Sequence, residues 1–98
     1  MKRDAIVIRV EDNVATAIRS LETGYEATVG IGEKVIRLKL CQSIDYGHKM
    51  ALGDIASGEE ILKYAAVIGK ATRPIKAGEH VHIHNVESLR GRGDLHSS

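Results

Sequence analysis

A short pattern of apolar residues and glycine recurs in the second half of the sequence. Segments 51–61 and 71–81 share Ala, Ile, Gly-Glu and a final β-branched residue in the same positions, at a spacing of 20 residues. A fainter copy consists of Ala17, Leu21, Gly24 and Ala27. In each copy the apolar residue can anchor the chain, while glycine can take the positive φ of a tight turn. The pattern predicts short strands that are separated by frequent turns, with Glu59 and Glu79 serving the turn geometry.

Most of the remaining segments are also expected to be strands. The core must be built from Ile, Val, Leu and Ala, because the chain has no Phe or Trp, and β-branched residues favour strands. A glycine-containing stretch at 30–34 predicts a hairpin. The expected strands are 5–10, 25–29, 35–40, 49–52, 60–64, 67–72 and 80–85.

One short helix is expected near the amino terminus. Asp12 or Asn13 can cap it, and Gly24 can end it. Its apolar stripe would consist of Val14, Ala17, Ile18 and Leu21. The expected fold class is therefore mostly β with one short helix.

Charge and composition argue against several classes of partner. A net charge of +1 and an aromatic content of 3% offer neither the field nor the stacking surfaces that nucleic-acid binding requires. Cys41 is the only cysteine, so no internal disulfide can form, which is typical of a reducing compartment. Without a long apolar run or secretion signal, the sequence predicts a cytoplasmic protein that does not bind membranes.

Three of the five histidines lie between His80 and Asn85. If 80–85 is a strand, Val81 and Ile83 face the core and the histidines line the other face. Histidines two residues apart can share a metal ion, but His80 and His84 would lie about 13 Å apart along a strand. A complete site would then need His48 or a carboxylate. The same row is also consistent with histidines that bond to the backbone or to a partner.

Three motifs together resemble a known family. Residues 47–52, 68–72 and 78–85 are similar to the amino-terminal domain of altronate and galactarate dehydratases, which also occurs as the small subunit of sulfolactate sulfo-lyase. The resemblance runs from about Asp4 to Leu95. It implies a SAF-type β-clip domain, related to type III antifreeze proteins, over residues 4–86. Residues 87–98 are then expected to form a polar tail or linker.

The resemblance also implies a function. The chain is expected to be a small subunit or amino-terminal domain of a metal-dependent sugar-acid dehydratase, a carbon–oxygen lyase. It would complete or cap the active site of a large catalytic subunit and be inactive without it. The metal would be a divalent ion such as iron or manganese, shared with that subunit. The substrate could be altronate, galactarate, sulfolactate or another hydroxy acid.

Particular residues can be given expected roles on this basis. Histidine exchanges protons near neutral pH, and lysine holds carboxylates as a point charge. Lys70 is an alternative to Lys49 for the carboxylate. The expected roles are catalysis for His48, substrate binding for Lys49, His84 and Asn85, and metal binding for His80 and His82.

A second function remains open at this stage. The same fold could serve as a non-enzymatic module that binds a carbohydrate or small anion, or that mediates assembly, because a fold does not determine a function. Self-association into a homo-oligomer is compatible with either function.

Overall fold

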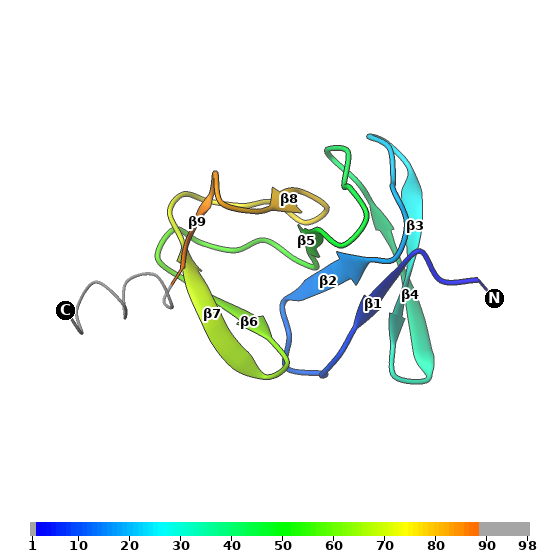
Figure 1. Ribbon diagram of the computed structural model, residues 1–98, viewed down its shortest axis with the longest axis horizontal. Coiled ribbons are helices and arrows are strands. Elements are labelled where there is room, and N and C mark those ends of the chain that lie inside the picture. The colour runs from blue at the N-terminus through cyan, green and yellow to red at the C-terminus, as the bar shows by residue number, and fades with distance from the viewer. Residues whose placement is uncertain (1, 89–98) are drawn as a thin grey trace.

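The computed structural model describes residues 2–88, all of whose regular elements are strands (Figure 1). One sheet has the order β4-β3-β1-β2-β5-β8 and the other has the order β6-β7-β9. The strands are β1 (Ala5–Val7), β2 (Val14–Ala17), β3 (Glu26–Ile31), β4 (Lys34–Lys39), β5 (Lys49–Ala51), β6 (Glu60–Lys63), β7 (Ala66–Ala71), β8 (His80–Val81) and β9 (Val86–Ser88). The mostly β prediction is confirmed, and so is the hairpin, formed by β3 and β4. None of the described residues forms a helix long and apolar enough to cross a membrane.

The predicted short helix is wrong, because strand β2 occupies its place. Val14 pairs with Ala51 of β5, and Ala17 pairs with Ala5 of β1. Both faces of β2 are covered, so Val14 and Ala17 belong to a strand buried on two sides. The other two residues of the expected stripe lie beyond β2: Ile18 is exposed, and Leu21 is buried in the turn that bridges to Ile44. Asp12 caps no helix; its carboxylate accepts hydrogen bonds from backbone N–H groups, including that of Ala65.

The repeated turn is present four times, once more than the sequence indicated. The copies span 17–27, 40–50, 51–61 and 71–81, and their glycines have φ values between 82° and 85°. The copies associate in pairs through the backbone bridges Leu21–Ile44 and Ile55–Ile75. Within each pair, each glycine N–H donates to the carbonyl of the first residue of the other copy, over 2.7–2.9 Å. The turns therefore stabilise one another rather than standing alone.

Two glutamates close their own turns, as predicted. The Glu59 carboxylate accepts a hydrogen bond of 2.9 Å from the Ala56 N–H. In the paired copy, the Glu79 carboxylate accepts one of 2.9 Å from the Lys76 N–H. Their equivalence supports a structural role for both carboxylates.

Two hydrophobic clusters lie on opposite faces of the central strands. In β2, Val14 belongs to one cluster and Ala15 to the other; in β5, Ala51 and Met50 divide in the same way. Side chains of successive residues in a strand point to opposite faces, so β2 and β5 form a wall common to both cores. Figure 1 shows these strands between the β3–β4 hairpin and the smaller sheet. His48 and Lys49 come immediately before Met50, next to this wall.

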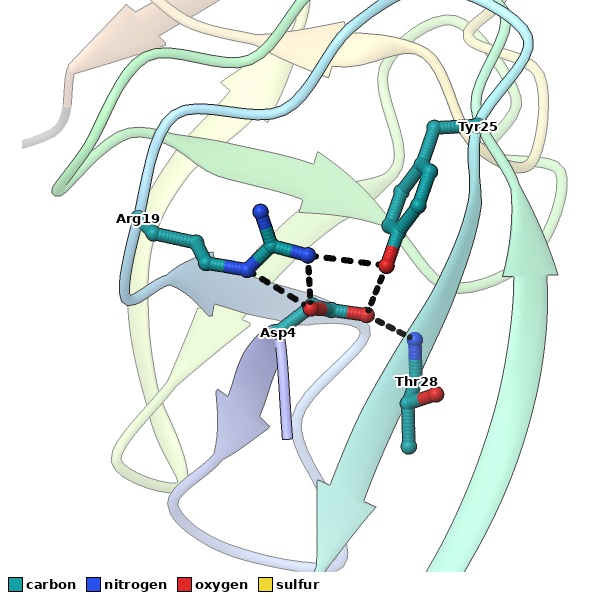
Figure 2. Close-up of polar contacts among 4 residues, drawn as sticks. All are labelled: Asp4, Arg19, Tyr25 and Thr28. Atoms are coloured by element: carbon teal, nitrogen blue, oxygen red, sulfur yellow. Dashed lines mark hydrogen bonds and ion pairs between the residues drawn. The ribbon is translucent and has the colours of Figure 1, made fainter. Parts of the chain in front are cut away.

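A polar cluster fastens the amino-terminal strand to the rest of the larger sheet (Figure 2). The buried Asp4 carboxylate accepts hydrogen bonds from Arg19 Nε at 2.8 Å, Tyr25 Oη at 3.1 Å and the Thr28 N–H at 2.8 Å. Burial by itself raises the pKa of Asp4, but these hydrogen bonds, led by that from Thr28, outweigh it and lower the pKa. Asp4 is therefore held as a carboxylate.

The strand expected at 80–85 is wrong beyond Val81. Strand β8 comprises only His80 and Val81, and residues 82–85 form a turn. Val81 is buried as predicted, but Ile83 is 84% exposed rather than part of the core. Strand β9 then begins at Val86 and pairs with β7, so residues 87 and 88 of the expected tail are in a strand. Residues 89–98 of that tail lie outside the described residues.

A histidine cluster as the candidate functional site

The turn after β8 is built around the side chain of Asn85. This side chain is fully buried; its Nδ2 donates to the His80 carbonyl at 2.8 Å, and its Oδ1 accepts from the His82 N–H at 3.0 Å. The Asn85 N–H also donates to the His82 carbonyl. These bonds fold the chain back on itself, so His80, His82 and His84 gather instead of spreading along a strand.

His48 joins this group because β5 and β8 are neighbours. Their antiparallel pairing places Met50 opposite His80 and Lys49 opposite Val81. The His48 Nδ1 lies 2.9 Å from the His80 Nε2, and the His48 and His82 rings are stacked with centroids 4.4 Å apart. The structure thus brings together a turn residue and the late histidine row, which are distant in the sequence.

Three of the imidazoles lie close enough together to be candidate ligands of one metal ion. Ring nitrogens of His48, His80 and His82 all lie within 4.8 Å of one another. The His84 ring centroid is 5.3 Å from that of His80, although the strand spacing predicted a much larger separation. His84 is exposed at the edge of the group, whereas the other three are half-buried.

The surroundings of two of these histidines favour the neutral imidazole. Burial lowers the pKa of His80, and nearby His48, His82 and His84 lower it further against an opposing effect of Asp45. Burial also lowers the pKa of His82, with smaller contributions from His48, Lys49 and His84. Neutral imidazole is the form that binds metal ions, so both side chains are suited to ligation at neutral pH.

A pocket of about 620 Å³ adjoins the histidine cluster. Lys49, Lys63 and His82 contribute polar groups to it, and much of the remaining lining is aliphatic. Burial lowers the pKa of Lys49, and the charge of Lys63 lowers it further. His82 belongs both to the pocket and to the cluster, so the two features are continuous.

Some of the predicted site residues lie at the cluster or the pocket, and others do not. His48, His80 and His82 meet, and Lys49 lines the adjoining pocket. Asn85 is fully buried with its amide engaged by the backbone, so it shapes the turn and has no free group for a substrate. Lys70, the alternative to Lys49, is exposed on β7 and does not line the pocket.

The sequence did not indicate Lys63 or the pocket. Lys63 ends β6 and comes to the pocket through tertiary packing, for which no local motif exists. A feature of the sequence could have indicated that His48 lies near His80. The missed copy of the turn at 40–50 places the His48 segment beside β2, and β5 then pairs with β8.

Comparisons with known proteins agree with this architecture. The family described as altronate/galactarate dehydratase SAF domain matches residues 3–89. The (2R)-sulfolactate sulfo-lyase subunit alpha of Chromohalobacter salexigens is 32% identical over 93 residues, which are 92% of this chain and 99% of that subunit. Altronate dehydratase of Escherichia coli is 42% identical over 83 residues, which are 85% of this chain but 16% of the dehydratase.

A third relative shows the same difference in length. Galactarate dehydratase (L-threo-forming) of Escherichia coli is 36% identical over 77 residues, and the match covers 14% of that enzyme. The chain thus corresponds to nearly a whole subunit in one type of relative and to a small part of a larger chain in the other. With the family matched over almost all described residues, the chain belongs to the altronate/galactarate dehydratase SAF domain family.

Proposed function

We propose that this chain is the small subunit, or the amino-terminal domain, of a metal-dependent lyase that acts on hydroxylated sugar acids or similar hydroxy acids. Its histidine cluster would complete the active site of a large catalytic subunit. The observation that carries the proposal is the convergence of His48, His80 and His82 within 4.8 Å. The names of the relatives, which are lyases of altronate, galactarate and sulfolactate, supply the reaction class.

The three converging imidazoles are suitable donors for a divalent ion such as iron or manganese. Imidazole binds iron readily, and carboxylates from a partner would suit manganese. His48 takes the third ligand position in this proposal, in place of the proton-transfer role suggested by the sequence, because its Nδ1 faces His80. Three protein ligands leave coordination positions open. When bound, such an ion supplies Lewis-acid polarisation of a substrate oxygen.

The remaining residues of the site would bind and orient the substrate. His84 is exposed beside the His80 ring, where its imidazole can donate a hydrogen bond to a hydroxyl or carboxylate. Lys49 offers a positive charge at the pocket next to His82. The half-buried imidazoles and the exposed rim together would form one wall of a site whose other wall belongs to the large subunit.

The proposal is tested by reconstitution with a large catalytic subunit of the same family. The combined protein is assayed with altronate, galactarate and sulfolactate, and the chain alone is expected to be inactive. The double variant His80→Ala/His82→Ala is expected to lower kcat about a hundredfold or more, because a metal site that loses ligands loses its ion. His84→Ala is expected to raise KM with a smaller effect on kcat.

A matched surface variant separates these effects from general damage. Arg37 lies on β4, exposed and paired with Glu26, and Arg37→Ala is expected to leave kcat and KM unchanged. Full activity of the double histidine variant would refute the proposed role of the cluster. Binding of the large subunit without any dependence of activity on the histidines would identify an assembly module instead.

A further inference from the structure

The pocket beside the cluster has an unusual distribution of charge. Its described lining includes Lys49, Lys63 and His82 but no Asp or Glu. Within residues 2–88 the ion pairs are Arg19–Asp4 and Arg37–Glu26, so neither lysine has a carboxylate partner there. The Lys63 Nζ lies 4.8 Å from the centre of the Tyr64 ring, a contact that leaves its charge unneutralised.

The aliphatic wall of the pocket increases the effect of these charges. Ile61, Ile68 and Val81 line the same space, and Ile61 and Val81 are among the most buried side chains. A charge near such a wall interacts more strongly than in bulk water, because the local dielectric constant is lower. Half-buried Lys49 therefore carries a cost that an anionic ligand would relieve.

The two lysines also indicate how much negative charge the ligand carries. A monoanion neutralises one of two like charges, whereas a dianion neutralises both and also relieves their mutual repulsion. A volume of about 620 Å³ falls within the range of small-molecule sites. His82, shared with the histidine cluster, would lie against one end of such a ligand.

We propose that this pocket is a binding site for a small organic dianion, either a dicarboxylate or a sulfonated carboxylate, held by Lys49 and Lys63. The identification of this dianion with a lyase substrate rests on the proposed function, but the binding itself does not. Among the acids named for the relatives, galactarate and sulfolactate carry two acidic groups and altronate carries one. The pocket should therefore bind galactarate and sulfolactate more tightly than altronate.

The test is a titration of the isotope-labelled chain in metal-free buffer, followed by NMR. The probes are galactarate as the dianion, gluconate as a monoanion of the same carbon number, and galactitol as the uncharged analogue. Chelators are omitted because they are themselves polyanions. Galactarate is expected to shift the signals of Lys49, Lys63 and His82, and to bind about tenfold more tightly than gluconate. Galactitol is expected to cause no shift at these residues.

Three lysine variants identify the groups that bind. Lys49→Met and Lys63→Met keep the aliphatic stem but remove the charge, and each is expected to weaken galactarate binding about tenfold. Lys70→Met is the matched control, since Lys70 is exposed outside the pocket, and it is expected to bind galactarate as the unaltered chain does.

Two results would overturn the inference. One is equal affinity for galactarate and gluconate, or no binding of either; the other is a loss with Lys70→Met as large as with the pocket variants. Because no metal is present, this outcome does not depend on metal binding by the histidine cluster. If galactarate binds but the His80→Ala/His82→Ala variant keeps full lyase activity, only the proposed function is contradicted. If the histidines bind metal but the pocket does not bind galactarate, only this inference is contradicted.

Discussion

At the scale of single residues, the geometry of the candidate site depends on one buried amide. Asn85 bonds to the backbone of His80 and His82 through both ends of its side chain. A sequence of alternating histidines and apolar residues predicts a strand, and nothing local shows that an asparagine will end it. The sequence therefore drew attention to these histidines, but the backbone predicted for them was wrong beyond Val81. It also assigned Asn85 to the substrate, although the residue positions the turn.

Replacing Asn85 by alanine should disorder the cluster. The His80 carbonyl and the His82 N–H would lose their partners, at a cost of about 3 kcal/mol in the free energy of unfolding. Asn13→Ala is a matched control, because Asn13 makes a comparable pair of bonds to the backbone of Glu60 and Leu62, away from the histidines. Denaturant unfolding should show a loss of stability in both variants. Only Asn85→Ala should separate the histidine ring signals in NMR, and unchanged ring contacts would contradict this role.

Asp4 should give the protein a defined acid sensitivity. The folded protein lowers the pKa of Asp4, so the ionised form stabilises the fold above the ordinary Asp pKa of about 3.9. That stability is lost as the pH falls through the lower folded pKa. Asp4→Asn should therefore cost about 2 kcal/mol near neutral pH, with a difference from the unaltered chain that shrinks below about pH 4.

The measurement for Asp4 is the free energy of unfolding as a function of pH. Glu11→Gln removes an exposed carboxylate and serves as the control, with no comparable pH-dependent loss expected. A difference between Asp4→Asn and the unaltered chain that stayed constant down to strongly acidic pH would contradict the assignment of Asp4 as the titrating group.

At the scale of elements, the paired glycine turns explain both the success and the failure of sequence-based prediction. Three copies share Ala as the first residue and were recognised from the sequence. The copy at 40–50 has Leu40 and Met50 in place of smaller or β-branched residues, so it was missed. The segment 14–21 was predicted as a helix because its apolar residues follow the helical spacing i, i+3, i+4, i+7. Strand β2 is buried on both faces, so it lacks the polar/apolar alternation that would have indicated a strand.

Two glycines of the repeat should respond very differently to alanine. Gly58 and Gly78 share a positive φ, which costs an L-residue about 1–2 kcal/mol. A Cβ at Gly58 would meet nothing within 4 Å, whereas one at Gly78 would lie 2.1 Å from the Lys39 carbonyl oxygen. Gly58→Ala should therefore lose only the conformational cost, and Gly78→Ala should lose about 4 kcal/mol or more. Thermal unfolding of the two variants measures the contrast, and equal losses would contradict the close approach at Gly78.

At the scale of the whole molecule, the site lies where the two cores meet. Strand β5 contributes Met50 to one core and Ala51 to the other, and His48 and Lys49 come directly before them. This position gives the cluster and the pocket a rigid support while leaving His84 and Ile83 exposed. The mostly β architecture could be predicted from β-branched composition and glycine spacing. The pocket could not, because Lys49 and Lys63 meet only through the packing of the two sheets.

A divalent metal site made by the three imidazoles can be detected by adding Mn²⁺ to the isotope-labelled chain and mapping paramagnetic broadening by NMR. Broadening is expected to be strongest at residues 47–49 and 80–84, and His80→Ala/His82→Ala is expected to abolish it. Broadening that is centred on carboxylates elsewhere, or that persists unchanged in the double variant, would contradict the claim.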